Sequence, residues 1–436
     1  MIQTHFRIIF KIIASIISLI AFVILTFIVV ALWRNVFTYP RLEKEVATFN
    51  NKYREPASII DLTTYRGIIH AHSYWSHDSE GTLDDILPAA KNAGISFIFL
   101  TDHPHGNIDS FPRGYAGYYD GILIEPGSEK QKLAVWPLVT TVIDWTIDND
   151  SLVEQVVEAG GMIFYAHTEE PHDWDNPWFQ GMEIYNFHTD TKDEKLLPNV
   201  INFLINGNQY RQWAMQQMFD EQTSILSRWD SLNLHRKIVG YSAVDIHENQ
   251  NIRARQLNDT TIVWYGPNAK PFRTGRKNFW NRWLFSEPDS NGWVFKLMID
   301  TYKEGFNHIV NYVVADTINV ESISESILNG HLYSAFKSLG DAHGFIYWSE
   351  NREGGINGIL GDSVIINEAR SLHAVSPLPG IFRLIHNGEV IEQTKKEGYE
   401  YSKTGNLKKG NYRLEIHIKL NNKLVPWLYT NPIYLY

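Results

Sequence analysis

The apolar positions of the chain fall into three regions, and the first is a continuous run. From Ile12 to Trp33 no side chain is charged, and isoleucine, valine, leucine and phenylalanine dominate. As a helix this run would be about 33 Å long, enough to cross a hydrocarbon core of about 30 Å. The run is too long for a typical signal peptide, and no small-residue cleavage site follows it. We therefore predict a retained transmembrane anchor over residues 8–33, with a cleaved signal peptide as the alternative.

Charges on either side of this anchor bear on its orientation. Residues 1–7 form a short tail, and the basic residues before and after the span nearly balance, so the positive-inside count does not decide. Because almost everything that can fold follows the anchor, we expect a single-pass protein with its tail in the cytoplasm and its body outside. Residues 34–58 are polar and mixed in charge, and are expected to form a juxtamembrane linker.

The second region, residues 59–343, alternates short apolar runs with amphipathic helix patterns. "YRGIIH", "ISFIFL" and "MIFYAH" are typical of buried strands, and "TLDDILPAAKNAG" predicts a helix that Thr82 begins and Gly94 ends. Later helices are expected to begin at Ser151 and Ser322. Continuous apolar strands that alternate with helices predict a parallel sheet covered on both faces.

Ionisable side chains recur just past the predicted carboxyl ends of these strands. In a barrel of parallel strands those ends meet at one mouth, whereas an open sheet gathers only the few near its switch point. A closed or nearly closed α/β barrel therefore collects them best. The residues are His70, His72, Asp102, His103, Glu129, His167, Asp245 and His247.

The remaining parts of the chain follow other patterns. Residues 250–295 are rich in Trp, Arg, Asn and Pro, and predict an irregular insertion at the barrel mouth or rim. Its stretch "NFWNRWLF" (278–285) fits a substrate cleft, a membrane contact or core packing. Over residues 344–436, short alternating runs separated by turn signals such as "HNGE" predict a small antiparallel β domain, a sandwich.

Composition narrows the chemistry. The 436 residues include no cysteine, so disulfides, thiolate metal sites and cysteine nucleophiles are excluded. The formal charge of −10 argues against an extended nucleic-acid-binding surface. Any metal must therefore be held by histidine, aspartate and glutamate.

The stretch "GIIHAHSYWSHDS" (67–79) has the pattern of a metal site. His70 and His72 lie two apart on an extended strand, so they face the same side. Either His77 or Asp78 can turn back from the following loop, and spacing leaves that choice open. Burying this many ionisable groups without partners is costly, and divalent cations compensate for it. Imidazole combined with carboxylate favours Zn, Mn or Fe over Ca.

The ordered motifs "HAHSYWSHDS", "LTDHP", "EPGSE", "FYAHTE" and "SAVDIH" resemble those of the polymerase-and-histidinol-phosphatase (PHP) domain superfamily of metal-dependent phosphoesterases. "SHDS" and the ending "VPWLYTNPIYLY" are similar to a membrane- or envelope-associated branch with a C-terminal β domain. The resemblance covers about residues 60–436. It implies a distorted, TIM-like (β/α)7 barrel that binds two or three divalent ions, usually Zn, Mn or Fe.

The same resemblance implies which residues hold the metals. His70 and His72 would hold one metal together with Glu129 and Asp245. Glu129 would bridge to a second metal, which His167 also holds. The third position would be held by His103, His247 and either His77 or Asp78.

One departure from the family pattern affects the second metal. Many relatives carry a further histidine soon after the bridging glutamate, and none lies between Glu129 and His167 here. His172 and His188 are candidates to replace it. Otherwise water completes the second site, or that site is lost.

The implied reaction needs no side-chain nucleophile, because divalent metals make water nucleophilic near neutral pH. Asp102 and Asp78 are the candidate catalytic carboxylates, and Asp102 has orientation of His103 as its alternative role. Arg253 and Arg255 are candidates to bind a substrate phosphate, and otherwise are solvated loop residues.

These inferences favour a membrane-anchored phosphoesterase acting on a small-molecule or nucleotide-like phosphoester. The same metal chemistry would also serve hydrolysis of a carboxylic ester, amide or carbamate. A third possibility is a non-catalytic envelope protein with structural metals, whose β domain binds a glycan or partner. Structural metal sites are closed, whereas catalytic ones keep an open position.

Overall fold

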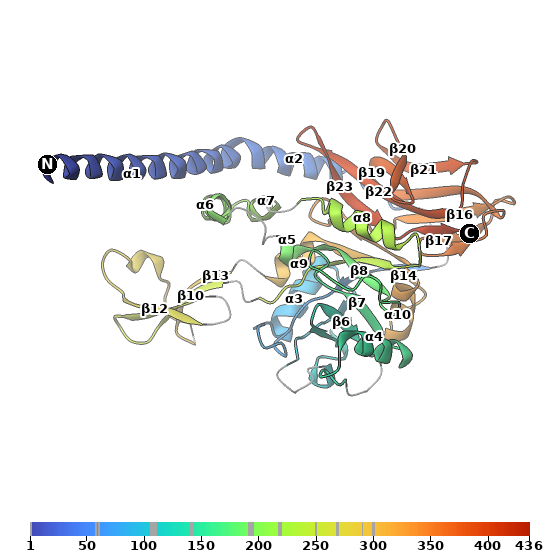
Figure 1. The fold of residues 1–436 in the computed structure, drawn as a ribbon, viewed down its shortest axis with the longest axis horizontal. Coiled ribbons are helices and arrows are strands. Elements are labelled where there is room, and N and C mark those ends of the chain that lie inside the picture. Colours follow the sequence, from blue (N-terminus) through green and yellow to red (C-terminus); the bar gives the residue numbers. More distant parts are fainter. Residues whose placement is uncertain are drawn as a thin grey trace.

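A computed structural model gives the fold of the chain (Figure 1), in which an N-terminal helix, a mixed α/β body, a small insertion sheet and a C-terminal β region follow one another. The structure describes residues 2–56, 59, 62–104, 111–138, 143–190, 196–216, 220–248, 251–266, 270–289, 291–298 and 301–436.

Helix α1 (Ile2–Trp33) is apolar, and its side chains from residue 10 onward are almost all exposed. It is long and apolar enough to cross a membrane, a test that a signal peptide also passes. The chain continues through a π-helical turn (Arg34–Thr38) into α2 (Tyr39–Asn50). The stretch predicted as a linker is therefore helical through residue 50, and α2 buries an apolar face made by Tyr39, Leu42 and Phe49.

Six parallel-paired strands form the centre of the α/β body. They lie in the order β4 (Ile122–Glu125), β2 (Phe97–Phe99), β1 (Thr63–Ile69), β9 (Val239–Ala243), β8 (Gly181–Asn186) and β7 (Met162–Tyr165). Antiparallel strands flank them: β3 (Gly117–Tyr119) on β4, β6 (Leu133–Trp136) and β5 (Ser128–Lys130) beyond β7, and β14 (Val310–Ala315) and β15 (Leu332–Ala335) beside β1. The predicted α/β class is confirmed, but the sheet is mixed rather than wholly parallel. One residue pair, Ile69–Ala243, joins β1 to β9, so the closed (β/α)7 barrel stays a prediction.

The helices of the body begin and end largely as their caps dictate. Thr82 and Asp85 form the predicted capping box of α3, and Gly94 ends that helix with φ 66°. The predicted starts at Ser151 and Ser322 are wrong by one turn. Each serine N–H donates to an earlier Asp148 or Asn319 side chain, because Asp and Asn are strong N-caps. The helices are α3 (Leu83–Ala93), α4 (Asn149–Glu158), α5 (Phe187–Asp190), α6 (Leu196–Asn206), α7 (Arg211–Gln216), α8 (Thr223–Leu232), α9 (Tyr302–His308) and α10 (Val320–Leu328).

Alternation along the strands divides the core into two sides. Ile68 and Ile98 pack with the helices, whereas Ile69, Phe97 and Phe99 belong to a second cluster on the other face of the sheet. Because both faces are buried, the strands read as continuous apolar runs. Many of the buried polar side chains therefore lie just beyond the strand ends, although Glu129 lies within β5 and Glu183 within β8.

The insertion is more regular than its sequence predicts. Strands β10 (Asn251–Gln256), β11 (Thr261–Tyr265), β12 (Pro271–Arg276) and β13 (Trp293–Met298) form an antiparallel sheet in the order β12-β11-β10-β13. The predicted irregular stretch is therefore wrong. Ala254, Ile262 and Val294 form its small core. In Figure 1 this sheet projects from the body on the same side as α1.

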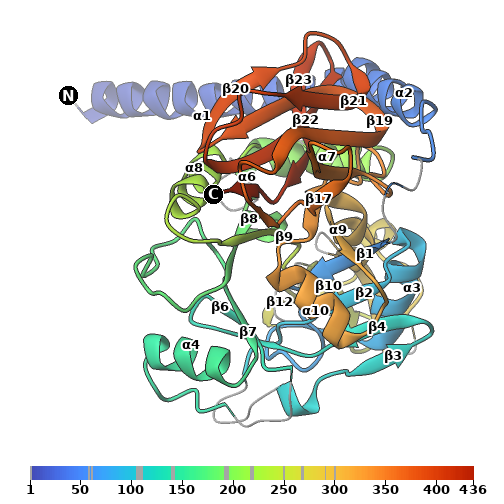
Figure 2. The same ribbon diagram turned by 90° about the vertical axis from the view of Figure 1, so that its right-hand side faces the viewer.

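The C-terminal strands are mainly antiparallel, as predicted, with one parallel pair between β18 and β24. The 18-residue strand β19 pairs through its first half with β16 and β21, and through its second half with β20 and β22. Figure 2 shows these strands gathered on one side of the α/β body, and β23 pairs with β15 of that body. The sandwich and its boundary after residue 343 stay predictions. The strands are β16 (Ile346–Asn351), β17 (Ile356–Ile359), β18 (Ser363–Val364), β19 (Ala369–His386), β20 (Glu389–Gln393), β21 (Gly398–Thr404), β22 (Gly410–Leu420), β23 (Lys423–Thr430) and β24 (Ile433–Leu435).

A buried ion-pair network joins this β region to helix α8. Arg413 Nε and Nη2 lie 2.7 and 2.8 Å from the two carboxylate oxygens of Asp230, and Arg413 also contacts Glu415. Glu415 lies 2.9 Å from His417 Nε2. Burial raises the pKa of Glu415, but His417 and Arg413 outweigh it and lower this pKa to about 2. The network therefore holds charges that are costly to leave unpaired.

Candidate metal centre

Five strands deliver the predicted metal ligands to one end of the sheet. His70 and His72 follow β1, His103 follows β2, and Glu129 lies in β5. The others follow β7 and β9: His167, Asp245 and His247. His70, His167 and Asp245 have positive φ angles of 69°, 52° and 51°. Non-glycine residues seldom adopt this backbone conformation, and its cost is typical of functional sites.

The first cluster contains His70, His72, Glu129 and Asp245, whose donor atoms all lie within 4.8 Å of one another. Nε2 of His70 lies 3.0 Å from Glu129 Oε2, and Nε2 of His72 lies 3.3 Å from the same oxygen. Asp245 Oδ1 lies 3.4 and 3.2 Å from these two nitrogens. All four residues are buried, so their donor atoms meet in a water-poor environment.

The two oxygens of Glu129 face different histidines. Oε2 points to His70 and His72, whereas Oε1 lies 2.9 Å from Nε2 of His167. His167 Nε2 is also 3.8 Å from Asp245 Oδ2. A carboxylate between two sets of imidazoles has the geometry that a bridging ligand requires.

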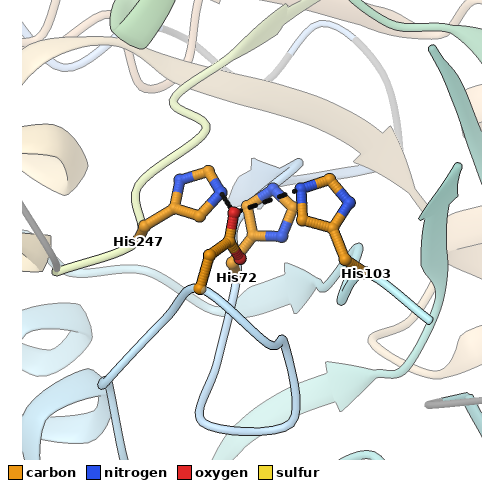
Figure 3. A group of neighbouring side chains, drawn as sticks. His72, His103 and His247 are labelled. Atoms are coloured by element: carbon orange, nitrogen blue, oxygen red, sulfur yellow. Dashed lines mark ion pairs between the residues drawn. The ribbon is translucent and has the colours of Figure 1, made fainter. Parts of the chain in front are cut away.

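A second cluster contains His72, Asp78, His103 and His247, again with donor atoms within 4.8 Å of one another. Asp78 Oδ2 lies 3.4 Å from His247 Nε2 and 3.6 Å from His103 Nε2. Figure 3 shows the three imidazole rings grouped side by side, and the His72 and His247 rings stack with centroids 3.9 Å apart. His72 therefore belongs to both clusters.

The structure distinguishes His77 from Asp78, which the sequence could not. The Asp78 carboxylate enters the second cluster, whereas the His77 side chain is exposed and belongs to neither described cluster. The His77 ring lies 5.3 Å from the His103 ring, centroid to centroid. Geometry thus favours Asp78 as the ligand from this loop.

The charges and unpaired atoms of the clusters fit divalent metal ions. Burial lowers the pKa of His70, but the charges of Asp245, Glu183 and Glu129 outweigh it and raise this pKa well above its usual value. For Glu129, burial raises the pKa, but the charge of His70 outweighs burial, so this pKa lies well below its usual value. Within the described residues, the buried Asp245 Oδ1 has no hydrogen-bond partner. The site therefore stabilises positive charge, and it holds this carboxylate oxygen beside the Nε2 atoms of His70 and His72, where a cation would bind.

Glu183, in β8, is the residue that the sequence analysis missed. Its Oε1 lies 2.5 Å from His70 Nδ1, and its Oε2 accepts a hydrogen bond of 2.7 Å from the His167 N–H. A proton on Nδ1 leaves the Nε2 lone pair of His70 facing the first cluster, the usual arrangement for a metal-binding histidine. The available signal was a carboxylate in an otherwise apolar strand, "MEIYNFH".

Asp102 lies beside the clusters and holds the loop that carries the ligands. Its two oxygens accept hydrogen bonds from Ser73 N–H and Oγ–H, at 2.5 and 2.8 Å. Burial raises the pKa of Asp102, although the hydrogen bonds from Ser73 oppose this shift. His103 Nδ1 lies 2.9 Å from the backbone oxygen of Glu129. That carbonyl orients the His103 ring. A catalytic role of Asp102 stays a prediction.

The predicted phosphate-binding arginines have other partners. Arg253 Nη2 lies 2.5 Å from Glu80 Oε1, and its guanidinium lies 4.5 Å above the Trp293 ring. Arg255 also lies over Trp293, at 6.0 Å. These three contacts join the insertion sheet to itself or to the loop after β1. A role of the two arginines in binding substrate stays a prediction.

His172 and His188, the candidates to replace the histidine missing after Glu129, differ in position. His172 Nε2 contacts the backbone oxygen of His167, and its ring stacks on Tyr165 with centroids 4.5 Å apart. The His188 ring lies 5.4 Å from that of His247. His188 is thus beside the second cluster, whereas His172 packs against the strand behind His167.

Comparisons with known proteins find a likeness to solved structures. No protein-family model matches the chain, and no curated protein matches it. The chain is similar in structure to a PHP-like protein. That solved chain is a two-domain protein from Bacteroides vulgatus ATCC 8482, described as containing a predicted PHP-like metal-dependent phosphoesterase. The match covers 87% of this chain and 98% of that one, with 13% identity and a TM-score of 0.33.

Proposed function

We propose that the chain is a membrane-anchored, metal-dependent phosphoesterase acting on a small-molecule or nucleotide-like phosphoester. The observation that carries the proposal is the placement of Glu129 between two sets of imidazoles, with His72 shared by a neighbouring cluster. Eight histidine and carboxylate residues, carried by five strands and the loops after them, converge there. The metals that such ligands favour are Zn, Mn and Fe.

The ligands would divide among two or three metal positions. His70, His72, Glu129 and Asp245 would hold the first metal, and Glu129 with His167 would hold the second. The third position would be held by His103, His247 and Asp78, with His72 beside it. The second position has few protein ligands in this assignment, which leaves it open to water or substrate.

Bound divalent metals would activate water and stabilise charge on a phosphoryl group. The surrounding residues prepare the site for this. Glu183 fixes which ring nitrogen of His70 carries the proton. It also accepts a hydrogen bond from the His167 N–H and so positions His167, the proposed ligand of the second metal. Asp102 holds Ser73 and thereby the loop between His72 and Asp78. In this proposal Asp102 and Asp78 are the carboxylates that exchange a proton with the leaving group.

Anchoring and orientation are part of the proposal. The exposed apolar face of α1 over residues 10–33 supports a span across the bilayer. The tail would lie in the cytoplasm and the α/β body outside. Modification of a single introduced cysteine by an impermeant reagent on intact cells tests this: Glu353→Cys should react, and failure to react until the cells are lysed would reverse the orientation.

The test of the activity is an ester panel with purified full-length protein. After removal of metals and reloading with Mn or Zn, the protein should hydrolyse a generic phosphomonoester or phosphodiester, and the His70→Ala variant should not. Hydrolysis of carboxylic esters alone would indicate the alternative enzyme class. Inactivity towards both ester classes with every metal would favour a non-catalytic role and contradict the proposal.

A further inference from the structure

The insertion sheet carries a group of aromatic side chains that its own core does not use. The sheet packs around Ala254, Ile262 and Val294. By contrast, four aromatic residues of the β12 strand and the loop after it, here named the aromatic tip, are largely exposed. They are Phe272 (61%), Phe279 (67%), Trp280 (81%) and Trp283 (77%).

Local hydrogen bonds hold the loop of the aromatic tip in one shape. Asn278 Oδ1 accepts from the Trp280 N–H at 2.9 Å, and Asn281 Oδ1 accepts from the Asn278 N–H at 2.7 Å. Trp283 Nε1 donates to the Trp280 carbonyl at 2.8 Å. The tip therefore presents its rings outward from an ordered turn. Phe285 packs against the core of the sheet, but core packing does not explain Phe279, Trp280 and Trp283.

The charge around the tip has the opposite sign to the chain as a whole. Residues 270–286 contain no Asp or Glu, although the chain carries a net charge of −10. Arg273, Arg276 and Arg282, which lie beside the aromatic tip, are exposed. The basic residues of this segment are Lys270, Arg273, Arg276, Lys277 and Arg282. Aromatic rings beside Arg and Lys match the boundary between lipid headgroups and hydrocarbon, and the positive charge complements anionic lipid.

The tip lies on the side of the molecule from which α1 leaves. Figure 1 shows α1 and the insertion sheet extending from the same side of the body, opposite strands β16 and β17. Helix α6 lies there too: Asn206 Nδ2 donates to the Ala31 carbonyl at 3.1 Å, and Tyr39 donates to Asn202 at 2.9 Å. Leu197 and Leu204 of α6 remain exposed beside α1.

We infer that the aromatic tip docks on an anionic phospholipid bilayer, the same bilayer that α1 crosses. This rests on the anchoring part of the proposed function and extends it. Helix α1 alone would leave the body free to tilt about one attachment point. A second, electrostatically assisted contact through the insertion, which follows His247 by a few residues, would fix the ligand clusters relative to the membrane surface.

The chain has no cysteine in any part of its sequence, so one introduced cysteine gives a unique label. Full-length Trp280→Cys, labelled with an environment-sensitive fluorophore, is placed in nanodiscs of phosphatidylcholine with or without phosphatidylglycerol. Brominated acyl chains should quench the label at 280, and more so with phosphatidylglycerol. They should leave a label on Glu353→Cys, in the turn between β16 and β17, unquenched.

A charge variant separates docking from simple proximity. Arg273→Gln, Arg276→Gln and Arg282→Gln together should weaken docking by about a hundredfold on the anionic nanodiscs, since each basic residue near such a surface contributes about 1 kcal/mol. The matched control is Arg352→Gln, in the exposed turn at the far end, which should change nothing.

Three outcomes would overturn the inference. A label at 280 as unquenched as that at 353, in both lipids, overturns it, as does quenching that ignores lipid charge and the triple variant. A Phe22→Cys label within α1 reports the anchor separately: quenching at 22 without quenching at 280 keeps the anchor and rejects docking. Hydrolysis of a soluble phosphoester by the same samples reports the proposed activity independently of both.

Discussion

Replacing Glu183 by glutamine tests the link between the buried carboxylate and metal binding. The side chain is 1% exposed. Besides His70 Nδ1 and the His167 N–H, its oxygens accept hydrogen bonds from Tyr241 Oη–H at 3.2 Å and Asn186 Nδ2–H at 3.0 Å. In Glu183→Gln one oxygen becomes an NH2 group, which can accept from none of these donors. Either orientation of the amide therefore places a donor against donors.

The expected loss follows from this geometry. Partners that orient a metal-binding histidine are worth about 10–100-fold in metal affinity, or about 1.4–2.7 kcal/mol. The amide also leaves at least one buried donor unpaired, which costs about 1–3 kcal/mol of folding stability. Chelator competition with Zn or Mn on the full-length protein measures the first quantity, and thermal unfolding of the metal-free protein measures the second.

The matched control is Glu170→Gln, whose carboxylate is half-exposed and pairs with Lys132 on the surface. It should change metal affinity by less than about twofold, because exposed ion pairs contribute little. If Glu183→Gln bound both metals as tightly as the wild type, the orientation of His70 by Glu183 would not matter. The argument from the buried carboxylate would then be refuted.

Three further predictions concern other parts of the molecule. Arg413→Met should lower the free energy of unfolding by about 3–5 kcal/mol in denaturant titration, because it strands buried carboxylates, and a loss below about 1 kcal/mol would contradict this. Burial, with a smaller contribution from Glu321, raises the pKa of Glu125 to about 7. The folded state thus binds the proton of Glu125 more tightly than the unfolded state does, so this group stabilises the fold at low pH. About 2–3 kcal/mol of that stabilisation is lost between pH 5 and 8. Glu125→Gln should remove that loss, and an unchanged pH profile would show the carboxyl to be uninvolved. Asp78→Asn should reduce the bound metal by one equivalent in elemental analysis while His77→Gln should not, and the reverse result would exchange their roles.

Much of the α/β body follows from local sequence rules. The strands appear as apolar runs because both faces of the sheet are buried, and the residues after them gather at one end because the strands are parallel. His70 and His72 could be paired from their spacing alone. Their meeting with Glu129, His167 and Asp245 was predicted from strand order and from the resemblance, not from any local signal.

Other features depend on tertiary contacts that no local pattern reveals. Choosing Asp78 over His77 requires the path of a loop, and both residues have metal-binding chemistry. Glu183 was missed because its strand looks apolar and its partners are far apart in the sequence. The insertion sheet was missed because its small core and exposed aromatic rings give no clean alternation. Helix starts at Ser151 and Ser322 were misplaced because the stronger caps, Asp148 and Asn319, precede them by three residues.

The most direct test of the metal centre is elemental analysis of purified full-length protein, combined with anomalous diffraction at the absorption edge of the metal found. Two or three metal ions per chain are expected, with anomalous peaks between Glu129 and its three histidines and beside Asp78. The variant Glu129→Ala should lose at least one of them. Metal-free protein that stays so after incubation with Zn, Mn and Fe, or peaks found only away from His70, Glu129 and Asp245, would contradict the central claim.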